Sequence, residues 1–306
     1  MNKLLKIIAL VLLSANSFGQ INQEDSTLSV VGYWDKNEEQ TYTVQIEKCK
    51  LKGSDTTSIE TINYEVDILI KDSTENSYTI EWKYKNFESD SDNEFTKKLM
   101  SISNNLKVII KTDELGAFQE VVNWKEIRDQ ISDALEVLRK EFKDVPKIKD
   151  ITKQVGLMFS TKEAIESGSI KEIQQFYSFY GSKYKLNEVL TGKQKLANLY
   201  GGEPFDADYE LELTTIDTAS DSGIVRYLQT VDKKQVTDAT YEYLKKNAIA
   251  MKTPIPERED IPELTIEDRT ASNIHGPSGW ILYTINIREV TAEDVTSIET
   301  REIELK

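Results

Sequence analysis

The side chains that could support catalysis are sparse in this sequence. His275 is the sole histidine, and it lies in the turn-like run Ile274-His275-Gly276-Pro277-Ser278-Gly279. A single histidine excludes metal motifs that pair two histidines, such as HExxH. A Ser-His-Asp triad needs no sequence neighbours, but Ser278 is not in a GxSxG motif because Trp280 stands two positions later. We therefore interpret His275 as a turn residue.

Three carboxylates alternate in the acidic run 88–94: Asp90, Asp92 and Glu94. Oxygen ligands at this spacing could bind Ca²⁺. The rest of an EF-hand loop is missing, because Phe95 stands where glycine is needed and Ser101 where the bidentate glutamate is needed. The sequence favours a solvated acidic turn before a short helix over 95–101, with metal binding by the three carboxylates as the alternative.

Two short patterns resemble parts of enzyme motifs. Ser182-Lys183-Tyr184-Lys185 matches the SxxK element of penicillin-recognising enzymes, but no SDN or KTG companion is present. Thr191-Gly192-Lys193 lacks the upstream glycine of a phosphate-binding loop, because position 187 is Asn. No pair among the 53 acidic residues is marked for glycoside hydrolysis. The sequence predicts no cofactor and favours a protein that is not an enzyme, with a carboxylate-dependent hydrolase as an alternative.

Aromatic residues are the remaining group, with 14 Tyr, 9 Phe and 4 Trp. Four of them share one face of a predicted hairpin: Tyr64, Tyr78, Trp82 and Tyr84. Three more lie on a predicted helix: Phe176, Tyr177 and Tyr180. Core packing accounts for such a group. The functional alternative is an apolar cavity between a curved sheet and its helices, where small molecules often bind. These seven residues are the predicted binding residues of such a cavity.

Alternation of apolar and polar residues predicts the strands that would position these aromatics. A single strand is predicted over 42–46, and paired strands over 62–70 with 78–84, 106–112 with 117–122, 209–216 with 224–231, and 280–290 with 297–305. Sheets of about nine or more strands twist and curve. The sequence therefore predicts a large, curved antiparallel sheet.

Helical spacing of apolar residues predicts three main helices, over 124–142, 169–180 and 235–250. Asn123 and Glu126 form an approximate capping box before the first helix. Three prolines make 252–262 an extended connection. The order of elements predicts an α+β fold, in which a half-barrel-like antiparallel sheet packs around a central helical block. We predict a single domain over 20–306, with two α+β halves that divide near residue 181 as the alternative.

Residues 1–19 have the composition of a secretory signal peptide. Lys3 and Lys6 precede an apolar run that ends at Leu13, and small and polar residues follow. The run is shorter than the roughly 20 residues that span a bilayer. The only cysteine, Cys49, is far from the cleavage point, so no lipid anchor is expected. We predict an exported protein, periplasmic or secreted, without a membrane span.

The formal net charge of −15 limits the partners of this chain. Removal of the signal peptide also removes Lys3 and Lys6 and leaves the mature chain more negative. Such a charge repels phosphate backbones and anionic headgroups, so we expect neither nucleic acid nor a membrane surface as a partner. A single cysteine excludes an internal disulfide. An apolar small molecule is the partner that the composition leaves open, and the oligomeric state is left open too.

The signal sequence ends Ser17-Phe18-Gly19-Gln20, which resembles the signals of exported proteins from Gram-negative gliding and gut bacteria. The run over 106–126, with Asp113-Glu114-Leu115-Gly116-Ala117-Phe118 and Asn123-Trp124-Lys125-Glu126, resembles a pattern in uncharacterised exported proteins of such bacteria. The expected architecture is similar to that of periplasmic lipoprotein carriers. This resemblance implies an exported protein that binds an apolar small molecule or lipid. A structural or interaction module of the cell envelope is a further alternative.

Overall fold

The computed structural model describes residues 21–198 and 202–306, and the predicted signal peptide lies outside them. An antiparallel sheet of eleven strands dominates the described chain. Its members are β3 (Glu39–Lys52), β4 (Asp55–Thr74), β5 (Ser77–Ser89), β6 (Lys107–Asp113), β7 (Phe118–Val121), β9 (Val189–Leu196), β10 (Phe205–Asp217), β11 (Ser222–Val231), β12 (Leu264–His275), β13 (Ile281–Ala292) and β14 (Val295–Leu305). The β-rich α+β class expected from the sequence is therefore present.

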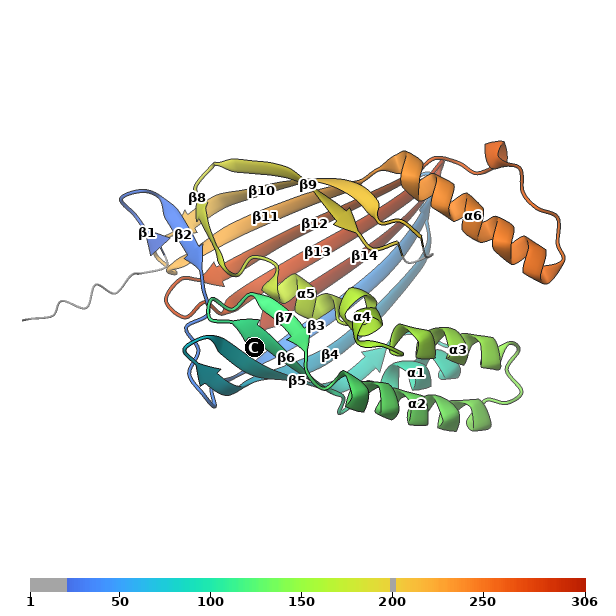
Figure 1. Cartoon of the computed structure of the whole chain (residues 1–306), viewed down its shortest axis with the longest axis horizontal. Helices are drawn as coiled ribbons and strands as arrows, with labels where there is room; N and C mark the ends of the chain where they lie inside the picture. The colour runs from blue at the N-terminus through green and yellow to red at the C-terminus, as the bar shows by residue number, and fades with distance from the viewer. Residues whose placement is uncertain (1–20, 199–201) are drawn as a thin grey trace, which may run out of the picture.

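The strand order in the sheet is β7-β6-β5-β4-β3-β14-β13-β12-β11-β10-β9. Two series of sequential hairpins meet at its centre, where β3 pairs with β14 and Val44 lies opposite Ile303. The sheet curves strongly, and its edge strands β7 and β9 do not meet, so it is not closed into a barrel (Figure 1). Closure would have removed both edges.

A second, three-stranded sheet lies at one end of the molecule (Figure 1). It consists of β1 (Ile21–Asn22), β2 (Thr27–Val30) and β8 (Ser182–Lys185), which were not predicted from the sequence. Leu28 and Val30 of β2 are fully buried. This small sheet therefore covers one end of the hydrophobic core.

In the described part of the chain, six α-helices accompany the sheets: α1 (Glu94–Ser101), α2 (Trp124–Glu141), α3 (Ile148–Met158), α4 (Lys162–Ala164), α5 (Lys171–Tyr177) and α6 (Lys233–Met251). A π-helical turn (Ile165–Ser169) joins α4 to α5, and a 3-10 turn (Arg258–Asp260) interrupts the extended connection after α6. In Figure 1, α5 lies across the inner side of the curved sheet. Helices α1, α2 and α3 group at the lower right, and α6 lies at the upper right, beyond the ends of β10 and β12.

The predicted first helix is confirmed, but its start differs in detail. Ile127, Ile131, Leu135 and Leu138 of α2 are buried, as their helical spacing predicted. Asn123 does not cap α2 with its side chain. Its amide accepts a hydrogen bond from the Ile109 amide at 2.8 Å, so it ties the helix start to β6. The second predicted helix begins at Lys171 rather than 169, because a π-helical turn precedes it.

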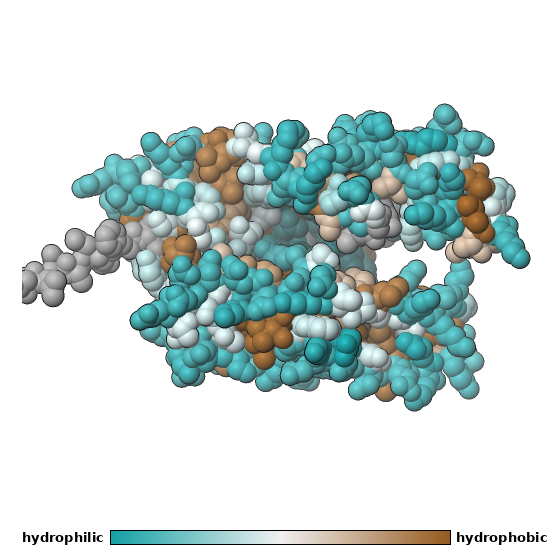
Figure 2. Space-filling view, in the orientation of Figure 1, coloured by the Kyte–Doolittle hydropathy of each residue, from teal (hydrophilic) through white to brown (hydrophobic). Residues whose placement is uncertain are grey.

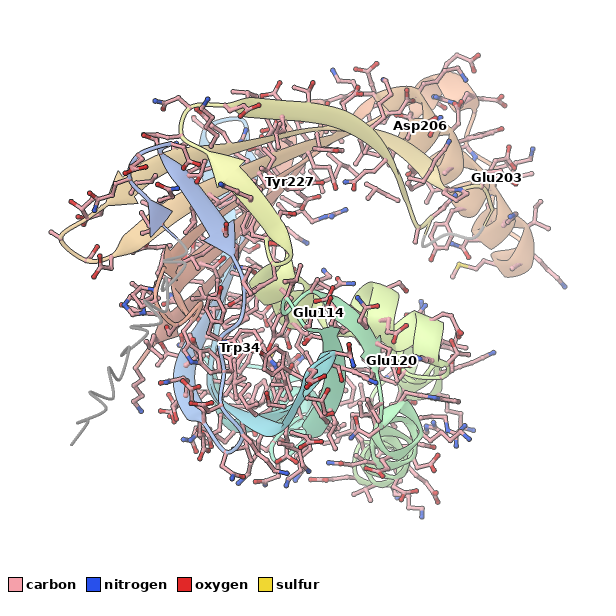
Figure 3. All side chains as sticks on the ribbon, turned by 60° about the vertical axis from the view of Figure 1, so that its left-hand side comes forward. Trp34, Glu114, Glu120, Glu203, Asp206 and Tyr227 are labelled. Carbon is pink, nitrogen blue, oxygen red and sulfur yellow. The ribbon has the colours of Figure 1, made fainter. Side chains whose placement is uncertain are left out.

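Aromatic rings fill the core between the sheet and α5. Trp34 lies within the lobe that β3–β7 form (Figure 3), 5.2 Å from the ring of Tyr78 and 5.2 Å from that of Trp280. Phe176 of α5 meets Trp82 edge-on at 5.3 Å. Edge-to-face and tilted pairs at these separations stabilise a core beyond the area that they bury. The core thus joins residues from both ends of the chain.

Candidate functional site

The seven aromatic residues predicted for a binding cavity lie together in one hydrophobic cluster. All are buried: Tyr64, Tyr78, Trp82, Tyr84, Phe176, Tyr177 and Tyr180. Their polar atoms are bonded inside the protein: the hydroxyl of Tyr78 donates to Gly32 O at 2.8 Å, that of Tyr180 donates to Gly279 O, and Trp82 Nε1 donates to Tyr177 Oη at 3.4 Å. These contacts place most of the seven in packed core, while Tyr64 and Tyr84 also border an open space.

That space is a cavity of about 210 Å³ between the sheet and the helices. Tyr64 and Tyr84 form part of its wall. Apolar side chains from β3, β4, β6, α2 and their connections supply most of the remainder, including Ile46, Ile62, Leu106, Val108, Ile127 and Ile165. Glu172, in the first turn of α5, is the charged member of this lining. The cavity is therefore apolar with one polar wall.

The polar wall is built from Tyr84 and Glu172. The hydroxyl of Tyr84 donates to Glu172 Oε1 at 2.6 Å. Burial, reinforced by the negative charge of Glu172, raises the pKa of Tyr84 well above its ordinary value, and the same two causes raise the pKa of Tyr64. A phenol is protonated at neutral pH even at its ordinary pKa, and the raised pKa values extend this to more alkaline solution. Tyr84 acts as a fixed donor to the carboxylate at this wall.

A larger recess of about 660 Å³ adjoins the cavity, with Phe87 and Met100 common to both linings. Charged side chains of both signs line the recess. Lys97 Nζ lies 3.8 Å from a Glu94 oxygen, and Lys98 Nζ lies 3.7 Å from a Glu141 oxygen. The two spaces together form a polar vestibule beside an apolar interior.

Of the three carboxylates considered for Ca²⁺, Glu94 lines this recess, whereas Asp90 and Asp92 are not part of its lining. A carboxylate oxygen of Asp90 accepts a hydrogen bond from the Thr61 amide at 2.8 Å, and Glu94 faces Lys97. Asn93, between them, caps α1 by accepting from the Thr96 amide at 3.1 Å. Within residues 21–198 and 202–306, no group of three or more His, Cys, Asp or Glu side chains is arranged to hold a metal ion.

The other motif residues occupy turns and edge strands. His275 Nδ1 lies 2.8 Å from Ser278 Oγ in the turn that closes β12 and β13. The SxxK segment forms β8, and Gly192 lies in the edge strand β9. Cys49 is a free thiol on β3. Among the described helices, none combines the length and apolar character that crossing a membrane requires.

A polar group that sequence reasoning missed lies on the inner face of the sheet. Arg288 Nη1 donates to Asp268 Oδ2 at 2.9 Å, and Glu299 accepts from Arg301 Nη2 at 2.6 Å and lies 3.5 Å from Lys171 Nζ. Burial raises the pKa of Asp268. Burial acts in the same direction on Glu299, but Lys171 and Arg301 outweigh it and lower the pKa of that carboxyl. The registers of β12, β13 and β14 and the position of α5 on the sheet bring these residues together.

No family model matches the sequence, and no curated protein matches it. Three of the solved structures that align with it show how weak the similarity is. Lipovitellin, described for its lipid–protein interactions, is 12% identical over 89% of this chain with a TM-score of 0.39, and the alignment spans 25% of the lipovitellin chain. A candidate exported protein with a YmcC-like fold from Bacteroides fragilis is 9% identical over 91% of this chain and 99% of its own, with a TM-score of 0.25. A porin-like protein from Bacteroides uniformis is 6% identical over 86% and 95%, with a TM-score of 0.17. At these TM-scores, similarity carries no argument about function.

Proposed function

We propose that this chain is an exported, non-enzymatic protein whose single α+β domain, residues 20–306, binds an apolar small molecule or lipid between sheet and helices. The observation that carries the proposal is the apolar cavity of about 210 Å³ beside the vestibule. An apolar cavity of about 150 Å³ already binds benzene in another protein. The cavity therefore has room for an apolar ring or a short acyl segment.

The vestibule suggests where the polar part of such a ligand would lie. Its volume of about 660 Å³ falls in the range of roughly 300–1,000 Å³ that ligand pockets occupy. In its lining, Lys97 is paired with Glu94 of the same helix, and Lys98 is paired with Glu141 of α2. A ligand with its apolar part in the cavity would keep its polar part among these groups, in contact with water.

Export is supported by the sequence of residues 1–19. The order of a cationic start, an apolar run and small residues is that of a cleavable signal. The mature chain would be periplasmic or secreted, and without a cysteine at the cleavage point it would carry no lipid anchor. Expression of the full chain in a Gram-negative host tests this, because N-terminal sequencing of the periplasmic or secreted product should begin at residue 20 or 21. An intact N-terminus in the cytoplasmic fraction would contradict export.

The binding proposal is tested with N-phenyl-1-naphthylamine, a dye whose fluorescence rises when it enters an apolar site. The mature chain, after extraction with organic solvent and refolding, should enhance the dye fluorescence with a saturable, one-site isotherm. Native mass spectrometry of protein purified without extraction should show an adduct that extraction removes. The proposal fails if neither the dye nor an adduct is detected on the folded protein.

One observation favours a second function, a carboxylate-dependent hydrolase. Asp268 and Glu299 lie on the same face of the sheet, and their pKa values are shifted in opposite directions, as expected for an acid and a carboxylate that act together. Strands β12 and β14 are separated by β13, so the two Cα atoms are roughly 9–10 Å apart. Release of reducing ends from neutral oligosaccharides by the wild type, but not by Asp268→Asn, would support this function.

A further inference from the structure

A transverse row of side chains crosses the inner face of the sheet, separate from the apolar cavity. Its members are direct cross-strand partners from β9 to β14: Gly192, Tyr209, Gln229, Asp268, Arg288 and Glu299. Directly opposed side chains lie about 4.5–5.5 Å apart at Cβ. The side chains of this row lie on the same face of the sheet as the buried Ser272 of β12 and Ile303 of β14. The row therefore continues the face of the sheet that covers the core. These six positions form one continuous strip.

An aromatic platform lies at the β9 end of this strip. The ring of Tyr209 covers Gly192, where an added Cβ would lie only 2.5 Å from Tyr209 Oη. The glycine thus allows the ring to lie flat on the edge strand. Tyr227, on the same side of β11, stacks with Tyr209 at 5.9 Å and an interplanar angle of 28°. Both rings are partly exposed, so they offer an apolar surface to a ligand.

Hydrogen-bonding groups surround this platform. Gln194 Nε2 donates to the oxygens of Tyr227 and Gln229. Gln229 Nε2 in turn donates to Asp268 at 3.4 Å, and Arg288 donates to the same carboxylate at 2.9 Å. Amides, a phenol, a carboxylate and a guanidinium therefore form one hydrogen-bonded network beside two stacked rings.

The strip lies in a hollow of the molecule. Figure 2 shows a deep recess between the lobe formed by β3–β7 and the part of the sheet formed by β9–β11. The floor of this recess is hydrophilic where Figure 1 places β12, β13 and β14. Figure 3 shows Tyr227 on the arm of the sheet that faces the lower lobe. The Arg288 side chain is 40% exposed, so the recess reaches the strip.

We propose that this strip binds a neutral oligosaccharide, with a sugar ring stacked on Tyr209 and its hydroxyls bonded to Arg288, Asp268 and Gln194. Sugar hydroxyls both donate and accept, which matches the mixed groups of the strip. The apolar face of a pyranose ring matches an aromatic face. A neutral ligand fits better than an ion, because Asp268 is paired with Arg288, and Glu299 with Lys171 and Arg301, inside the protein. The site is independent of the apolar ligand proposed above.

The test is calorimetric titration of the mature chain with maltohexaose, cellohexaose, mannohexaose and an anionic hexagalacturonate. At least one neutral hexasaccharide should bind, and Tyr209→Ala should weaken that binding at least tenfold. Tyr283→Ala is the matched control, because Tyr283 lies on the opposite face of β13, and it should change the affinity less than twofold. Gln194→Ala, near the edge of the sheet, should weaken binding by about three- to tenfold and serves if Tyr209→Ala does not fold.

Three results would overturn the inference. The first is the absence of heat with every neutral hexasaccharide at millimolar concentration. The second is tighter binding of hexagalacturonate than of any neutral sugar. The third is an unchanged affinity in the folded Tyr209→Ala protein or, where that protein is unfolded, in Gln194→Ala. Dye binding to the apolar cavity is unaffected by each of these, so failure here is distinct from failure of the proposed function.

Discussion

Tyr84 of β5 donates its hydroxyl to Glu172 of α5 at 2.6 Å, and both residues border the apolar cavity. This bond joins the hairpin of β4 and β5 to α5. It also supplies a hydrogen-bond donor to the one carboxylate in the lining of the cavity. The wall of the cavity and the docking of α5 therefore depend on the same contact.

Replacement of Tyr84 by Phe should destabilise the protein. The change removes one hydrogen bond to a charged acceptor and leaves Glu172 less satisfied, which costs about 1–3 kcal/mol. Urea denaturation followed by tryptophan fluorescence measures this difference. Tyr33→Phe is the control, because Tyr33 is 52% exposed and its replacement should leave the unfolding midpoint unchanged. Equal midpoints for all three proteins would show that the bond contributes nothing.

Filling the cavity should abolish dye binding. Ser103 borders the cavity, so Ser103→Phe should place its ring in that space and reduce the affinity for N-phenyl-1-naphthylamine at least tenfold. Ser132→Phe introduces the same ring on the exposed side of α2 and should leave the affinity within twofold of the wild type. Fluorescence titration measures both. Undiminished binding in the folded Ser103→Phe protein would place the dye elsewhere.

Glu81 should contribute stability that is lost in acid. It is buried on β5, with Lys71 Nζ and Lys107 Nζ each 3.0 Å from a carboxylate oxygen. Burial acts to raise the pKa of Glu81, but the two lysines outweigh it and lower the pKa below the ordinary 4.5. The folded state therefore binds the proton less tightly than the unfolded state, and its stabilising effect is full above pH 4.5 and falls as the pH drops through the lowered value.

Glu81→Gln tests this dependence. At pH 7 the variant should be about 1–3 kcal/mol less stable than the wild type, since it loses charge-assisted hydrogen bonds. The gap should narrow on acidification below pH 4.5, as measured by urea denaturation at several pH values. Glu136→Gln removes an exposed helical pair with Lys140 and should behave as the wild type at every pH. A gap for Glu81→Gln that does not change with pH would contradict the assignment.

Gly192→Ala should disturb the aromatic platform with little effect on folding. The added methyl group must displace the end of the Tyr209 side chain, which is partly exposed. We expect a loss of affinity for the neutral hexasaccharide of about tenfold, with the thermal midpoint within a few degrees of the wild type. Gly168→Ala is the matched control, since no atom lies within 4 Å of its added Cβ. Identical binding isotherms for the wild type and both variants would show that Tyr209 does not contribute to the sugar site.

Much of the local structure could be predicted from the sequence. Alternation from Ile62 to Ile70 predicted β4 with the correct buried side, and helical spacing predicted α2 and α6. These patterns are local, so they need no knowledge of distant contacts. The helix α3 was missed because it follows Pro146 and begins after Lys147, a left-handed residue without a capping side chain.

The sites were harder to predict than the elements. The placement of Tyr64 and Tyr84 on the buried face of the sheet could be predicted because both belong to a strongly alternating hairpin. The strip from Tyr209 to Glu299 was missed, because its members come together only through the registers of successive strand pairs. A slip of one residue in any of them would turn a side chain to the other face, and the bulges in this sheet change registers in ways that sequence patterns do not reveal.

The pairing of β3 with β14 has a consequence for how this protein acquires its structure. The middle of the sheet consists of segments from near the beginning and the end of the chain. The two series of hairpins therefore cannot pair with each other until Val295–Leu305 has been synthesised. Pairings between such distant segments form slowly, since a long stretch of chain must be ordered first. A polypeptide whose central strand pair forms late remains unfolded for longer. Such a delay is compatible with passage through a narrow translocation channel before the fold closes.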